Sequence, residues 1–324
     1  MTPRSIFTSA LQIPPALAEQ GRGPSRLPRI EWAAWWDQTI RRWEAEGLPR
    51  MDWDASLRHF GLDVMRGLGA DPGAEPIETE ADYERLRPRL YPQKAIDRAA
   101  REAKRLSKAH ERGDFTIRFI LHGFFWYPRR LLGIEEHLLA FYDQPELMHR
   151  INQDLLAFNL AAIEAVCEYI RPDLLNLLED MSYNHGPMLS KACFDEFLRP
   201  YYLELAKALH SHGVPFFCDT DGLVDKLVPW LLDSGVDGIL PLERQSGVDV
   251  NALRAQYPGL LMLGGFDKMV MHKGEAAIRA EFERLLPLMR AGGYILSVDH
   301  QTPPGVSLED YRLYIRLLKE YTER

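Results

Sequence analysis

Two aspartates end an apolar segment of the chain, which reads FFCDTDG at residues 216–222. Side chains of a β-strand alternate between its two faces, so Asp219 and Asp221 are expected to point to the same side. Two like charges on one side repel each other unless a metal ion, a cationic side chain, a proton or water lies between them. The segment therefore predicts a functional carboxylate pair, although Asp221 alone would also suit the N-cap of a following helix.

Five further apolar segments end in ionisable residues in the same way. The six segments begin near residues 115, 173, 215, 238, 261 and 294, and the residues that end them are His122, Glu179, Asp180, Asp219, Asp221, Glu243, Asp267, Asp299 and His300. Histidine and carboxylate side chains are suitable ligands for a zinc-like divalent ion. The strand ends therefore predict a site for chemistry.

Several of these residues also have a structural interpretation. Asp267 and Glu243 are each followed by a basic residue, and such neighbours can form a surface ion pair of little energetic value. His122 ends an apolar run and would also suit a hydrogen-bonded core position. His300 precedes QTPPG, whose two prolines would hold the loop rigid beside a site.

The stretch FFWYPRR follows the first of these segments. Arg129 and Arg130 could clamp a carboxylate or phosphate of a substrate, or they could belong to a solvated helix start. Trp126, Tyr127 and Tyr183 are predicted to form the wall of a pocket. The tryptophans at positions 32, 35, 36 and 43 lie at helical spacing and are most simply core residues, although a ring-shaped ligand could use them.

Amphipathic helical patterns separate the six apolar segments. Strands that alternate with helices pair in parallel, and the strand ends of a (β/α)8 TIM barrel meet on one face. A doubly wound sheet is the rival, but no G-x-G-x-x-G motif follows any of the segments. We therefore predict one barrel domain over residues 1–324, with a helical cap at 1–90 and clear β/α repeats at 91–324. Two strands must precede residue 115, and we place them within residues 57–64 or 75–79.

The composition excludes several classes of protein. The 324 residues include 46% hydrophobic and 27% charged residues, as in ordinary soluble domains. The net charge of -8 and the lack of a long basic run argue against nucleic-acid binding. The first thirty residues do not resemble a signal peptide, and no apolar stretch is long enough to span a membrane. Three widely spaced cysteines suit a reducing compartment, so we expect a cytoplasmic protein.

Along nearly its whole length the sequence resembles the uroporphyrinogen decarboxylase superfamily. The segments that carry the resemblance are MTPRSIFTSAL, RRWEAEGLP, HFGLDV, GFFWYPRRLLGIEEHLLAFYDQPELMHRI, LEDMSYNHGPMLS, DTDG, GGFDK and SVDHQTPPGVSLEDY. The resemblance implies a (β/α)8 barrel with its active site at the C-terminal ends of the strands, and a homodimer is consistent with it. The decarboxylases of this superfamily carry an N-terminal R-Q-A-G-R stretch, which this chain does not have.

A second branch of the superfamily comprises zinc-dependent methyltransferases that exchange methyl groups with corrinoid proteins. Their zinc is held by an H-x-C motif and a distant cysteine. Counted from the shared glycine, the H-x-C positions are Asp219 and Asp221 here, and counted back from the shared proline the distant cysteine falls near His300, with Asp299 beside it. The resemblance therefore implies a divalent metal, zinc or a harder ion, held by Asp219, Asp221 and His300. Glu179 would complete the shell or act as acid and base, and the corrinoid would arrive on a separate protein.

Three functions remain open from the sequence. The leading hypothesis is metal-assisted methyl transfer between a small methoxy, amine or thiol compound and a separate corrinoid protein or folate. The alternative is a cofactor-free decarboxylase that acts on a porphyrinogen or a smaller acid. The third is a non-catalytic module that binds a corrinoid or tetrapyrrole. The predicted catalytic residues are Glu179, Asp219, Asp221 and His300, and the predicted substrate-binding residues are His122, Trp126, Tyr127, Arg129, Tyr183, Glu243 and Asp267.

Overall fold

The computed structural model of the chain describes residues 1–12 and 26–323. These residues form two compact units. Unit 1 comprises Met1–Arg66, Arg112–Thr116 and Ile239–Arg324, and unit 2 comprises Gly67–Glu111 and Ile117–Gly238. Within the described ranges, none of the helices combines the length and the apolar character needed to cross a bilayer. The single-domain organisation expected from the sequence stays a prediction.

Strands and helices alternate along the chain, as the sequence predicted. The strands are β1 (Met65–Gly69), β2 (Thr116–His122), β3 (Leu174–Leu178), β4 (Ser182–Tyr183), β5 (Gly186–Pro187), β6 (Phe216–Asp219), β7 (Gly238–Leu240), β8 (Leu261–Phe266) and β9 (Tyr294–Val298). The helices are α1 (Pro3–Ala10), α2 (Asp37–Ala45), α3 (Trp53–Phe60), α4 (Glu80–Leu90), α5 (Gln93–Glu111), α6 (Trp126–Leu132), α7 (Ile134–Asp143), α8 (Pro145–Cys167), α9 (Lys191–Phe197), α10 (Arg199–Ser211), α11 (Val228–Leu232), α12 (Val250–Gln256), α13 (Glu275–Ala291) and α14 (Leu308–Thr322), with short 3-10 turns η1 (Arg244–Ser246) and η2 (Lys268–Lys273).

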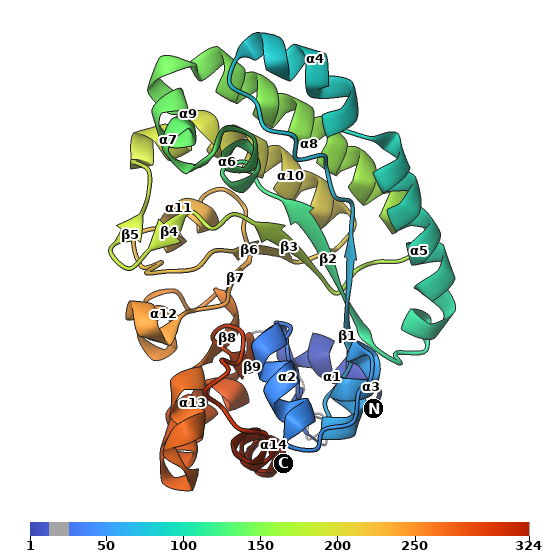
Figure 1. Cartoon of the computed structure of the whole chain (residues 1–324), viewed down its shortest axis with the longest axis vertical. Helices are drawn as coiled ribbons and strands as arrows, with labels where there is room; N and C mark the ends of the chain where they lie inside the picture. Colours follow the sequence, from blue (N-terminus) through green and yellow to red (C-terminus); the bar gives the residue numbers. More distant parts are fainter. Residues whose placement is uncertain (13–25, 324) are drawn as a thin grey trace. The chain divides into compact units, whose positions relative to one another are not determined.

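Unit 2 is built on the parallel strands β2, β3 and β6, which lie side by side in that order. Helix α8 packs on α5 and on α10 beside these strands (Figure 1). Almost every side chain of β2, β3 and β6 is buried or half-buried, as expected for parallel strands covered by helices. A small antiparallel hairpin, β4–β5, follows β3.

Unit 1 contains the parallel pair β8 and β9, in register from Met262 with Tyr294 to Phe266 with Val298. Helix α13 packs on these strands and on α14 (Figure 1). Helix α14 begins with a capping box, because Ser307 accepts from the Asp310 amide and the Asp310 carboxylate accepts from the Ser307 amide. This cap ends the loop that follows β9.

Of the two strands predicted before residue 115, the described residues contain one, β1, and it lies outside both predicted ranges, 57–64 and 75–79. Residues 57–60 belong to α3, which ends at the left-handed Gly61, and β1 follows at Met65–Gly69. The prediction failed because Gly67 and Gly69 are typical of a loop. In the fold, both glycines allow close packing, since a β-carbon on Gly69 would lie 3.0 Å from the Ile120 carbonyl oxygen. Within the described part of the first ninety residues, the regular structure outside β1 is helical, in α1, α2, α3 and α4.

Tryptophans and tyrosines of α2, α3 and α14 form an aromatic cluster in unit 1. Trp35 lies 5.2 Å from Trp43 and 5.5 Å from Tyr311 between ring centroids. Trp35 and Trp43 are core residues, as predicted, whereas Trp36 is 43% exposed and Trp32 is half-buried. The cluster also encloses one carboxyl group, that of Glu31, which accepts a 2.7 Å hydrogen bond from the Tyr311 hydroxyl.

Glu31 should make the stability of unit 1 depend on pH. Burial raises the pKa of Glu31 to about 7, although the Tyr311 hydroxyl opposes the shift. The unfolded chain releases this proton near pH 4.5, so the contribution of Glu31 is full below that pH and is lost as the pH rises towards 7. We expect Glu31→Gln to gain stability relative to wild type, by up to about 3 kcal/mol, between pH 4.5 and pH 8.

Urea unfolding at a series of pH values measures this difference. Glu309→Gln is the control, because Glu309 is exposed on α14. A difference between Glu31→Gln and wild type that does not change with pH would show that Glu31 is ionised in the folded protein.

Candidate active site

The register of the unit 2 sheet places three polar side chains on one face. Arg118 pairs with Leu174 and Asn176 pairs with Phe217, so Arg118, Asn176 and Asp219 all point to the same side. The other face packs on α10, where the Tyr202 ring stacks on Phe216 at 5.7 Å. Arg118, Asn176 and Asp219 therefore lie on the sheet face turned away from α10, and we call them the inner triad.

Within the inner triad, the Asp219 carboxylate interacts with both Asn176 and Arg118. Asn176 Nδ2 donates a 3.0 Å hydrogen bond to Asp219 Oδ2, and the Arg118 guanidinium acts on the same carboxylate by its charge. Desolvation raises the pKa of Asp219 to about 6, against the opposing effects of Asn176 and Arg118. Neither Arg118 nor Asn176 was among the residues predicted from the sequence. The signal for both was a polar residue inside an apolar strand, at FTIRFIL and LLNLL.

Asp221 follows the inner triad in the loop after β6 and is half-buried. The N-cap of α11 is Leu227, so the alternative interpretation of Asp221 as a helix cap is wrong. Gly222 holds this loop close to the β4–β5 hairpin. Its φ is +83°, and a β-carbon there would lie 2.6 Å from the Tyr183 backbone. The glycine in DTDG is thus required by a close approach of two backbones.

His122 ends β2 in a small charged cluster. Its Nε2 lies 2.9 Å from Asp71 Oδ1, and Arg130 Nη1 lies 3.2 Å from its Nδ1 and 3.5 Å from Asp71 Oδ1. Burial, reinforced by the charge of Arg130, lowers the pKa of His122 to about 4. The imidazole is therefore neutral at pH 7, so one ring nitrogen can donate a hydrogen bond and the other can accept one.

The other predicted wall residues have different roles. Tyr127 is fully buried, and its hydroxyl donates to the carbonyl oxygens of Gly73 at 3.0 Å and Leu90 at 3.3 Å, which makes it a structural residue. Arg129 donates to the Asp180 carbonyl oxygen at 3.2 Å and lies over the Trp126 ring at 5.3 Å. Tyr183 is 48% exposed on the hairpin.

Glu179 does not share the face of Asp219. It follows the end of β3, and its buried carboxylate accepts from the Tyr202 hydroxyl at 2.6 Å. The backbone amides of residues 124, 125 and 126 also donate to it, at 2.9, 2.8 and 3.1 Å. Burial raises the pKa of Glu179 to about 7. These four donors favour a positioning role at the start of α6, and the predicted catalytic role of Glu179 stays untested.

In unit 1, Asp299 ties the ends of three strands together. It is fully buried and accepts from the Arg244 amide at 3.0 Å, the Lys268 amide at 3.2 Å and Lys268 Nζ at 3.2 Å. Arg244 follows β7 and Lys268 follows β8, so the ends of β7 and β8 converge on the end of β9. Burial raises the pKa of Asp299, and Lys268 opposes that shift.

The neighbouring predicted residues of unit 1 belong to the turns after β7 and β8. Asp267 caps η2 through the Met269 amide at 2.8 Å and accepts from Gln245 Nε2 at 2.7 Å. Glu243 accepts from Ser246 Oγ at 3.2 Å. The predicted ion pair of Asp267 with its neighbour does not form, because Lys268 turns to Asp299. Substrate contacts by Glu243 and Asp267 stay predictions.

His300 begins the loop after β9, and its ring lies 6.2 Å from that of Trp32 in an edge-to-face arrangement. His300 belongs to unit 1, whereas Asp219 and Asp221 belong to unit 2. Inside either unit, the described residues offer no group of three His, Cys, Asp or Glu side chains that could hold one metal ion. The donors fit a resident divalent cation poorly at Asp219, because the Arg118 charge already acts on that carboxylate. The three-ligand site stays a prediction.

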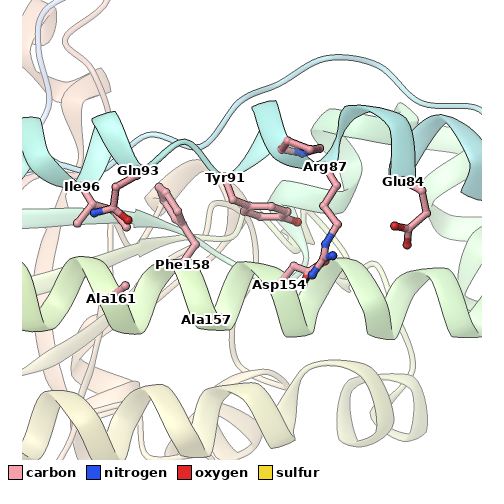
Figure 2. A pocket seen from close by; sticks show the side chains of 10 residues that line it. Glu84, Arg87, Tyr91, Gln93, Ile96, Asp154, Ala157, Phe158 and Ala161 are labelled. Atoms are coloured by element: carbon pink, nitrogen blue, oxygen red, sulfur yellow. Dashed lines mark hydrogen bonds and ion pairs between the residues drawn. The ribbon is translucent and has the colours of Figure 1, made fainter.

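A surface groove of about 440 Å³ lies along α4, α5 and α8 (Figure 2). Arg87 binds Asp154 through two 2.6 Å hydrogen bonds, and Glu84 pairs with Arg150 at 2.7 Å. The charged groups that line the groove are thus bound to other side chains of the protein. The lining residues include none of the residues predicted to form the site, so we do not assign the reaction to this groove.

The sequence matches the family model described as uroporphyrinogen decarboxylase (URO-D) over residues 55–321. A curated uroporphyrinogen decarboxylase from Nautilia profundicola is 26% identical over 196 residues, which cover 56% of this chain and 52% of that protein. One from Azotobacter vinelandii is 29% identical over 175 residues, which cover 51% of this chain and 46% of that protein. The chain thus spans about half the length of the curated relatives it matches.

A solved structure of a methyltransferase from Methanosarcina mazei is similar to this one with a TM-score of 0.70. The sequences are 13% identical, and the similarity covers 99% of each chain. At this identity the likeness shows the fold alone. The fold class predicted from the sequence, an α/β fold of the TIM-barrel type with an N-terminal helical extension, is confirmed.

Proposed function

Because the chain belongs to the uroporphyrinogen decarboxylase family, we propose that it is an enzyme that transfers methyl groups. The substrate is a small methylated compound, and the acceptor is a separate corrinoid protein or folate. The observation that supports the proposal most is the inner triad, in which Asn176 orients the Asp219 carboxyl on the face turned away from α10. A carboxyl group held in this way can supply the proton that a departing oxygen, nitrogen or sulfur requires.

For an O-methyl substrate the step balances as follows. The bond between the methyl carbon and oxygen breaks, the methyl group goes to the nucleophile of the acceptor, and the electron pair stays on oxygen. Asp219 gives its proton to that oxygen. The Nδ2 group of Asn176 and the charge of Arg118 then stabilise the carboxylate that remains.

Decarboxylation is the second candidate, and the charged cluster at the end of β2 favours it. Arg130 lies beside His122 and Asp71, and Arg129 is held against Trp126 in the same unit. Guanidinium groups bind carboxylates with two parallel hydrogen bonds, so these arginines suit an acidic substrate. In this reaction Asp219 would protonate the carbon that loses carbon dioxide.

The divalent metal implied by the family resemblance is a separate proposal. A metal held by Asp219, Asp221 and His300 would polarise the substrate atom that carries the methyl group. We derive no step through it, because the Arg118 charge competes for Asp219. Plasma mass spectrometry measures the metal content of the purified protein and of the Asp219→Asn variant. Metal that is bound by the wild type and lost in the variant would make a metal, and not Arg118, the partner of this carboxylate.

A methyl-transfer assay tests the proposed function. Methoxylated benzoates, methylamines and methylthiols are incubated with the protein and free cob(I)alamin, and methylcobalamin is followed by its absorbance. Uroporphyrinogen and simple aromatic acids are assayed in parallel for release of carbon dioxide. We expect methylcobalamin from at least one substrate class. Carbon dioxide release without methylcobalamin would replace the proposal by the second candidate. If neither methylcobalamin nor carbon dioxide is formed, both candidates are refuted.

A further inference from the structure

The loop that follows β9 carries His300 and has no regular secondary structure between residue 299 and α14. Backbone polar groups in such a loop must find partners elsewhere. Besides local bonds such as that from the Val306 amide to the Pro303 carbonyl oxygen, a series of partners comes from one segment near the N-terminus, residues 30–46. At the start of the loop, Trp32 Nε1 donates to the Val298 carbonyl oxygen at 2.7 Å, and Gln301 Nε2 donates to the Ala34 carbonyl oxygen at 2.8 Å.

The contacts continue to the middle of the loop. Thr39 Oγ1 donates to the Thr302 carbonyl oxygen at 2.9 Å, and Arg42 Nη1 donates to the Pro304 carbonyl oxygen at 2.8 Å. Thr39 and Thr302 are both fully buried. The Thr302 carbonyl accepts this hydrogen bond in a place without solvent, where its loss would be costly.

The end of the loop is bound in the same order. Trp43 Nε1 donates to the Val306 carbonyl oxygen at 3.0 Å, and the Leu308 amide donates to Glu46 Oε2 at 2.6 Å. Glu46 is itself held by Arg42 Nε at 2.7 Å. From Trp32 to Glu46, successive residues of one segment thus hold successive residues of the other.

The segment also reaches His300 itself. The Trp32 amide donates to Ser297 Oγ at 3.3 Å, and Ser297 Oγ donates to the Ile30 carbonyl oxygen at 2.8 Å. These bonds fix the Trp32 indole at the end of β9, where its ring meets the His300 ring at 80°. The His300 ring thus lies beside an indole that is held by its own hydrogen bond to the Val298 carbonyl oxygen.

We propose that residues 30–46 are a cradle that positions the His300 loop for the reaction, with Thr39 and Arg42 as its principal positioning residues. The cradle lies outside residues 55–321, the range that matches the family model. A loop inside the matched range is therefore held by a segment that lies before that range. The inference rests on the proposed methyl transfer and on the catalytic role that the sequence predicts for His300.

The test combines Thr39→Val and Arg42→Met in the full chain. Valine has the shape of threonine without the hydroxyl, and methionine removes the guanidinium but keeps an apolar stem. Arg41→Met is the matched control, because Arg41 is the next residue on α2, is 74% exposed and pairs with Asp37. Hydrogen exchange followed by mass spectrometry measures the peptides that span residues 298–308.

We expect exchange in these peptides to become about tenfold faster or more in the double variant, because two hydrogen bonds are lost. Exchange in β3 should not change, and the control should match wild type. Unchanged exchange in residues 298–308 would overturn the cradle. Equal acceleration throughout the chain would also overturn it, because the segment would then support only global stability.

Kinetic constants distinguish a role of residues 30–46 in positioning the His300 loop for the reaction from a purely structural role. With the substrate found in the methyl-transfer assay, we expect kcat to fall roughly ten- to a hundredfold while KM changes little. Arg42→Lys keeps one hydrogen-bond donor for the Pro304 carbonyl oxygen, so it should recover part of the lost kcat. If His300→Ala keeps full activity while the exchange result holds, the predicted role of His300 fails and the cradle stands as a structural feature. If the exchange result fails while His300→Ala is inactive, the cradle alone is refuted.

Discussion

Replacement of Asp219 by asparagine should lower kcat by about 100- to 10,000-fold, the usual contribution of one acid or base. Asparagine has the same shape and can still lie beside Asn176 and Arg118, but it cannot give a proton to the leaving group. The fold should be retained, because the substitution removes a carboxyl group whose ionised form is disfavoured by desolvation. Initial rates and a thermal melt of the same preparation measure both effects.

Asp225→Asn is the matched control for this experiment, because Asp225 is exposed in the same loop after β6. It should keep the activity of wild type within a factor of two. An Asp219→Asn enzyme that keeps more than a third of its kcat would show that the proton comes from another group. Asp221 would then be the next residue to test, since it lies on the same loop and is half-buried.

Gly123→Ala should cost about 3 kcal/mol of unfolding free energy or more, at the upper end for added volume in a packed core. A β-carbon on Gly123 would lie 2.0 Å from Glu179 Cδ. The Glu179 carboxylate cannot retreat, because Tyr202 and three backbone amides hold it in a buried position. Urea unfolding followed by circular dichroism measures the change.

Gly259→Ala provides the comparison, because nothing lies within 4 Å of the β-carbon it would add. Its unfolding free energy should stay within about 0.5 kcal/mol of wild type, as for most surface changes. A loss of less than about 1 kcal/mol in Gly123→Ala would mean that Glu179 can move. The positioning role assigned to Glu179 at the start of α6 would then be wrong.

Local patterns in the sequence determined the class of fold and the places where chemistry could occur. Apolar runs that alternate with helical periodicity predict parallel strands, and this depends only on neighbouring residues. The ends of those strands were found correctly for β2, β6, β8 and β9. The convergence of β7, β8 and β9 on Asp299 is the contact that parallel strands are expected to produce.

The face on which a residue lies could not be read with the same certainty. The register pairs Leu178 with Asp219, so Leu178 shares the face of Asp219 and Glu179, the next residue, points to the other face. The Glu179 carboxylate therefore meets Tyr202 and the amides at the start of α6 instead of Asp219. The first strand was misplaced for a related reason, since Gly67 and Gly69 serve close packing against Ile120 and not a turn.

Partners far apart in the chain were decided by the tertiary structure alone. Arg118 and Asn176 meet Asp219 only because β2, β3 and β6 pair in one particular register. The contact of residues 30–46 with the His300 loop joins segments more than 260 residues apart. Sequence patterns report the periodicity of each element, whereas the partner of a charge or a carbonyl is chosen when all elements pack and every buried polar group must be satisfied.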